Sequence, residues 1–63
     1  MSVVKQIRER IELSQMELAA KLGVHISTVQ YWEKNGINAN GYRKMFPITP
    51  DDMLDDLLHE VVK

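Results

Sequence analysis

The sequence predicts an all-α fold, a compact bundle of about five short helices in a single domain spanning residues 1–63. Apolar side chains recur at intervals of three and four residues, helix-capping patterns precede several of these segments, and no segment alternates as a strand would. A chain this short buries only about 60% of its unfolded surface. We therefore expect every large apolar side chain to serve the core or an interface.

The first helix is expected over about residues 2–12. Val4, Ile7 and Ile11 lie three and four residues apart and form one apolar stripe. This stripe should face the core.

A second helix should begin after Ser14, since Glu17 stands three residues on and completes a capping-box pattern. Gly23 then ends it, because glycine best tolerates a left-handed backbone at a helix end. The side chains expected to face the core from this helix are Met16, Leu18, Ala19 and Leu22.

A third helix follows from about Ile26 to Lys34, with Val29 and Trp32 facing inward. Two short helices joined by a tight glycine turn, here over about residues 15–34, form a unit that can lay one helix across a DNA backbone and point the other into the major groove. Small Ala19 lets the two helices approach closely, and Val24 fills the corner. The side chains left to face outward are His25, Ile26, Ser27, Gln30 and Tyr31.

The remaining third of the chain is expected to hold a weak helix and a stronger one. Asn38 is the expected cap of a short fourth helix that carries Tyr42 and Met45, and Gly41 weakens this helix. Thr49 as cap and Pro50 at the first helical position should open an amphipathic final helix over about residues 50–62.

Charge is distributed unevenly along the chain. Residues 1–44 carry seven basic and four acidic side chains, whereas residues 45–63 carry one basic and five acidic ones. A polyanion would therefore meet the first two-thirds of the chain. The alternative is that these charges only solvate the surface.

Several functional classes find no support. Cysteine is absent, which excludes disulfides and thiolate metal sites and fits a cytoplasmic setting. The first ten residues become charged too early for a signal peptide, and no apolar run is long enough for a membrane span. No nucleophile, base and orienting group can be placed together, so we expect no enzyme, no cofactor and no small-molecule substrate.

These residues resemble the helix-turn-helix domains of the phage Cro and repressor (XRE-like) type. The segment "SQMELAAKLGV" is similar to the usual sequence of that family at this place, and the resemblance covers about residues 3–36. The positions in register with the family pattern are Gln15, Leu18, Ala19, Gly23, Val24, Val29, Trp32 and Glu33. Short length and a helical tail make the chain most similar to the small all-helical Cro proteins, with a lambda-repressor-like fold.

The resemblance implies DNA contacts at named positions. The first residue of the second helix, Gln15, would contact phosphate, and the start of the third helix would read base edges through Ile26, Ser27, Gln30 and Tyr31. Gln30 can pair with adenine, Ser27 can bond either base type, and Ile26 can pack on a thymine methyl or on a partner. Further expected phosphate contacts are His25, Lys34, Asn35, Asn38, Arg43 and Lys44.

Two departures from the family pattern affect helix ends. Glu12 stands where many relatives have a glycine that ends the first helix, so this helix is expected to end differently. His25 replaces the common Ser or Thr cap of the recognition helix.

The final helix presents an apolar stripe opposite its acidic residues. The candidates for a dimer face on it are Met53, Leu54, Leu57, Leu58 and Val61, with Val62 in the same stripe. A weak homodimer that tightens on DNA would match a palindromic operator; burial against the core is the alternative. The opposite face, Asp51, Asp52, Asp55, Asp56, His59 and Glu60, is expected to be solvated and to bind no metal.

Together these observations predict a sequence-specific DNA-binding transcriptional regulator, a phage or prophage repressor of the Cro kind in a bacterial cytoplasm, at the nucleoid. Two other classes stay open. One is an antitoxin-type interaction module whose C-terminal helix caps a toxin. The other is an excisionase-like architectural factor that bends DNA.

Overall fold

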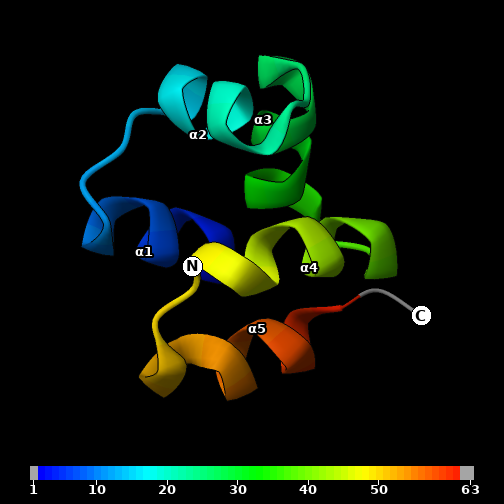
Figure 1. Ribbon diagram of the computed structural model, residues 1–63. Helices are drawn as coiled ribbons and strands as arrows, with labels where there is room; N and C mark the ends of the chain where they lie inside the picture. Colours follow the sequence, from blue (N-terminus) through cyan, green and yellow to red (C-terminus); the bar gives the residue numbers. More distant parts are fainter. Residues whose placement is uncertain (1, 62–63) are drawn as a thin grey trace.

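Residues 2–61 are described by a computed structural model, and they form five α-helices and two short 3-10 helices (Figure 1). In chain order these are α1 (Val3–Arg10), α2 (Gln15–Leu22), α3 (Ile26–Asn35), α4 (Ala39–Met45), η1 (Phe46–Ile48), η2 (Asp51–Met53) and α5 (Leu54–Glu60). The predicted all-α fold is confirmed. None of the helices in this part of the chain combines the length and apolar character that a membrane crossing requires.

The capping box at the start of α2 forms as predicted. The Glu17 backbone N–H donates to Ser14 Oγ at 3.1 Å, and the Ser14 backbone N–H donates to Glu17 Oε1 at 2.8 Å. At the other end, Gly23 takes the left-handed conformation with φ 70°. Each end of α2 is thus set by local contacts, the start by Ser14 and Glu17 and the end by the conformation of Gly23.

Glu12 occupies the backbone conformation that suits glycine. Its φ is 61°, in the left-handed region, and it follows Ile11, the C-cap of α1. The backbone N–H of Glu12 donates to Glu9 O, and that of Leu13 donates to Arg8 O at 3.0 Å. The glutamate therefore ends α1 by the geometry a glycine would use, at a backbone cost of about 1–2 kcal/mol.

The core joins side chains from every part of the described chain. Its buried apolar members are Val4, Ile7, Leu18, Ala19, Val29, Trp32, Ile37, Met45, Met53 and Leu57. The prediction for Met16 was wrong, since this side chain is 68% exposed on the outer side of α2. Ile37, between α3 and α4, is fully buried.

The predicted fourth helix forms, and Asn38 caps it by accepting the Gly41 backbone N–H at Oδ1, 2.7 Å away. Gly41 is a packing requirement rather than a weak point. A Cβ at Gly41 would lie 2.9 Å from Trp32 Cε2 and 2.5 Å from Ile37 Cγ1. Only glycine lets α4 approach Trp32 this closely.

The prediction for the start of the final helix was wrong. Instead of capping a helix, the Thr49 hydroxyl donates backward to Met45 O at 2.6 Å and is buried. Pro50 precedes the 3-10 helix η2, and α5 begins only at Leu54. The predicted residue Val62 lies outside the described residues.

The end of α5 closes the fold onto its beginning. Glu60 Oε2 accepts the Val3 backbone N–H at 2.7 Å, and Val61 pairs with Ile37 in a single parallel bridge. Glu60, predicted to be solvated, is therefore half-buried at the N-terminus of α1, where a carboxylate is favoured by the helix dipole. Figure 1 shows the result: α2 and α3 lie at one end of the molecule and α5 at the other.

Candidate nucleic-acid interface

Helices α2 and α3 form the predicted helix-turn-helix unit. The turn between them is held by backbone hydrogen bonds from Gly23 to Ala20 O and from Val24 to Ala19 O. Ala19 is buried where the helices meet, and Val29 and Trp32 anchor α3 to the core. One side of α3 is thus packed against the core, and Ser27, Gln30 and Tyr31 on its other side are exposed.

His25 caps α3, in the role predicted for it. Its Nδ1 accepts the Ser27 backbone N–H at 3.1 Å and lies 2.8 Å from Ser27 Oγ. Because Nδ1 is the acceptor for the backbone N–H, the Ser27 hydroxyl also donates to this nitrogen. The first turn of α3 is therefore ordered by a side chain that is itself exposed.

Three of the four predicted base-reading residues are exposed, and the fourth, Ile26, is partly buried. Ser27, Gln30 and Tyr31 are exposed on α3. Ile26 is partly buried and packs against the core, which corrects the expectation that it faces fully outward. Only part of its side chain is left for a base or a partner.

A chain of polar contacts runs from α1 to the exposed side of α3. Arg8 Nε donates to Glu33 Oε2 at 2.8 Å, with 14% and 10% of the two side chains exposed. Gln15 Nε2 donates to Glu33 Oε1 at 3.1 Å, and Gln30 Nε2 donates to Gln15 Oε1 at 3.4 Å. We call Arg8, Glu33, Gln15 and Gln30 the polar relay.

Arg8 and Glu33 were not among the predicted site residues. Each follows a buried apolar residue directly, Ile7 on α1 and Trp32 on α3. Charges of opposite sign beside the buried stripes of two helices that must pack together are a signal that would have paired them. The predicted residues Gln15 and Gln30 contact each other directly, and this pair holds Gln15 through Glu33.

The predicted phosphate-contacting residues all reach the surface, although four of them, Gln15, His25, Asn35 and Asn38, also make hydrogen bonds within the protein. Gln15 is partly exposed, and the others are exposed, namely His25, Lys34, Asn35, Asn38, Arg43 and Lys44. His25 and Asn38 are helix caps, and Asn35 Nδ2 donates to Tyr31 O at 3.4 Å. Lys34, Arg43 and Lys44, in the last turns of α3 and α4, supply positive charge.

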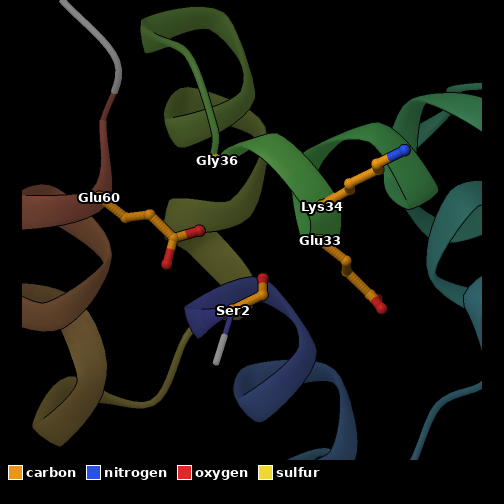
Figure 2. A pocket seen from close by; sticks show the side chains of 5 residues that line it. All are labelled: Ser2, Glu33, Lys34, Gly36 and Glu60. Atoms are coloured by element: carbon orange, nitrogen blue, oxygen red, sulfur yellow. The ribbon is translucent and has the colours of Figure 1, made fainter.

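A small polar hollow lies where the start of α1, the end of α3 and the end of α5 meet. It is lined by Ser2, Glu33, Lys34, Gly36 and Glu60. Figure 2 shows the Glu60 carboxylate pointing into it, while the Lys34 and Glu33 side chains point away from each other. Glu60 Oε1 is buried there without a hydrogen-bond partner among the described residues. Across residues 2–61, no three histidine or acidic side chains are grouped as metal ligands would be.

The predicted dimer face is only partly available. Met53 and Leu57 are core residues, which corrects their assignment to that face. Their side chains point into the core because α5 packs against α1. Leu58 is 53% exposed, and Leu54 and Val61 are partly exposed. Phe46, which was not predicted as part of this face, is 49% exposed.

Comparison with known proteins places the observed unit within a described family. Residues 4–41 match the model of a family described as "Helix-turn-helix", and this match spans α1 to the start of α4. No curated protein and no solved structure matches the chain.

Proposed function

The chain belongs to the helix-turn-helix family of the Cro and repressor type, and from this membership we propose that it is a phage or prophage repressor of the Cro kind that occupies a palindromic operator. As a member of this family it is a DNA-binding transcription regulator. The observation that carries the finer proposal is the exposure of Ser27, Gln30 and Tyr31 on a helix whose other side is anchored in the core. A helix held in this way can enter the major groove without unfolding its support.

The exposed side chains of α3 up to Tyr31 are proposed to read the bases. The Gln30 amide can pair bidentately with adenine, and the Ser27 hydroxyl can bond either base type. Tyr31 reaches a base or a phosphate, and the exposed part of Ile26 packs on a thymine methyl. Each good bidentate pair contributes about 1–3 kcal/mol of discrimination.

Phosphate contacts orient the domain on the duplex without reading sequence. Gln15 and His25, at the starts of α2 and α3, are placed to contact phosphates of the DNA backbone beside the major groove. Lys34, Asn35, Asn38, Arg43 and Lys44 extend this surface along the ends of α3 and α4. The acidic helix α5 lies at the far end of the molecule, where it does not repel the duplex (Figure 1).

A two-fold dimer would complete the operator complex. Leu58 is the most exposed apolar residue of α5, and Leu54 and Val61 leave part of their surface open beside it. One small module buries little DNA surface, so two copies are needed for tight binding. Two recognition helices about 34 Å apart would face successive major grooves of a palindrome.

Repression would follow from occupancy, since a protein bound at the operator excludes polymerase or a rival repressor. The proposed setting is the bacterial cytoplasm, at the nucleoid. The proposed role requires no cofactor and no small-molecule substrate.

Selection of preferred sites from random DNA tests this function. We expect a palindrome with half-sites about 10 base pairs apart, and binding that weakens steeply with salt. A single asymmetric site with strong bending would instead support an excisionase-like role. Absence of any preferred site, with a small toxin gene adjacent, would support the antitoxin-type role and overturn the proposal.

A further inference from the structure

The two oxygens of the Glu33 carboxylate have different partners. Oε2 accepts from the Arg8 guanidinium at 2.8 Å, and Oε1 accepts from the Gln15 amide at 3.1 Å. The Glu33 side chain is 10% exposed, so solvent competes little for either oxygen. Glu33 is therefore held in place from α1 and in turn holds a side chain of α2.

An ionised carboxylate only accepts hydrogen bonds, and this decides how Gln15 is oriented. Gln15 must turn its NH₂ group toward Glu33, because its carbonyl oxygen would meet another acceptor there. Its Oε1 then faces Gln30, which must present its own NH₂ group, as the 3.4 Å contact from Gln30 Nε2 reflects. The direction of donation is thus set along the whole polar relay.

We infer that Glu33 is a positioning residue for base readout, which orients the Gln30 amide through Gln15 so that Gln30 Oε1 is presented to the major groove as an acceptor. This inference rests on the proposed function. It assigns a role to a carboxylate that touches no base itself.

The orientation selects a class of base. A free acceptor at Gln30 Oε1 matches the donor groups of the major groove, adenine N6 and cytosine N4. The second hydrogen of Gln30 Nε2 stays available for adenine N7, so adenine is favoured. Guanine offers only acceptors at N7 and O6, and its O6 would meet Gln30 Oε1.

Glu33→Gln is the direct test, because it retains the shape of the side chain and replaces the acceptor that faces Gln15. Arg8 only donates, so a glutamine at position 33 keeps its carbonyl oxygen on Arg8 and turns its NH₂ group toward Gln15, and both amides are then expected to reverse. Gln15→Ala is the second variant, since it removes the middle of the relay and leaves the Arg8–Glu33 ion pair intact. Glu9→Gln, on the exposed side of α1, is the control for loss of one negative charge.

The measurement is the affinity ratio for two operators that differ at the base pair read by Gln30, adenine against guanine. That base pair is the one at which Gln30→Ala loses its preference. We expect a preference for adenine of about tenfold in the wild type and in Glu9→Gln, falling to about twofold or less in Glu33→Gln and Gln15→Ala. Circular dichroism confirms that each variant is folded at the assay temperature.

Each other outcome has a definite meaning. If Glu33→Gln keeps the tenfold preference, whatever Gln15→Ala does, or if Glu33→Gln loses it while Gln15→Ala keeps it, Glu33 does not act through Gln15 and the inference is wrong. A wild-type protein that selects no site at all would overturn the proposed function instead. That failure is seen before any variant is made.

Discussion

The indole ring of Trp32 lies where any side chain at Gly41 would have to go, with Trp32 Cε2 only 2.9 Å from the place of a Cβ. This approach joins α3, which carries the residues proposed to read bases, to α4, which carries the basic residues Arg43 and Lys44. The orientation of α3 relative to α4 therefore depends on a buried glycine, Gly41.

We predict that Gly41→Ala lowers the free energy of unfolding. Overpacking a core costs about 1–3 kcal/mol, against a gain of about 1 kcal/mol in helix propensity. Chemical denaturation should show a net loss of up to about 2 kcal/mol. The control is Asn40→Ala on the exposed side of α4, which should be neutral or slightly stabilising; a stabilised Gly41→Ala would contradict the close packing.

Glu12→Gly is expected to stabilise the protein. The left-handed backbone of Glu12 costs about 1–2 kcal/mol, and glycine removes this cost while adding about 0.4–1 kcal/mol of unfolded-state entropy. The net gain in unfolding free energy should reach about 1 kcal/mol in thermal or chemical denaturation. Glu12→Ala keeps the strained backbone and should show no such gain, so equal stabilities of the two variants would sink this account.

Acidification should weaken the N-terminal cap of α2. The Ser14 backbone N–H, and then its hydroxyl, hold the pKa of Glu17 below its ordinary value of 4.5. A lowered pKa means stability that is present above pH 4.5 and lost as pH falls through the folded-state pKa. Between about pH 6 and about pH 3, Glu17→Gln should therefore lose less stability than the wild type; identical acid profiles would rule out this contribution.

Gln30→Ala and Arg43→Ala should affect DNA binding differently. Gln30→Ala should weaken operator binding by about tenfold and leave random-DNA binding nearly unchanged, because only base contacts are lost. Arg43→Ala should weaken both alike and reduce the salt slope by about 1. Fluorescence anisotropy at several salt concentrations measures both effects, and equal losses from the two substitutions would tell against the assigned roles.

Two adjacent leucines of α5 should separate folding from assembly. Leu57 is fully buried, so Leu57→Ala should cost about 2–5 kcal/mol of unfolding free energy. Leu58 is exposed, so Leu58→Ala should change stability by less than about 0.5 kcal/mol.

If Leu58 contributes to a dimer face, Leu58→Ala should weaken binding to a full palindrome and leave binding to a half-site unchanged. Titration of both DNA fragments measures this. Equal affinities of the wild type and Leu58→Ala for the palindrome would remove this residue from the interface.

Sequence reasoning succeeded where structure is set by neighbours in the chain. The capping box of Ser14 and Glu17, the turn at Gly23 and the cap at Asn38 each depend on residues within about one helical turn. It failed for Thr49, which matches a cap in type but bonds backward to Met45 O. A residue type allows several local hydrogen bonds, and the surrounding packing selects one of them.

The sequence by itself determined the helical class, the positions of α2 and α3, and the outward-facing residues of α3 apart from Ile26. Local hydrogen bonds and a periodic apolar stripe carry this information without reference to the rest of the chain. Only the tertiary structure decided that Met16 is outside while Ile37 is inside, that Glu60 closes onto Val3, and that Glu33 meets Gln15. These contacts join residues 18 to 57 positions apart, or depend on which side of a helix the other helices cover, so no local pattern records them.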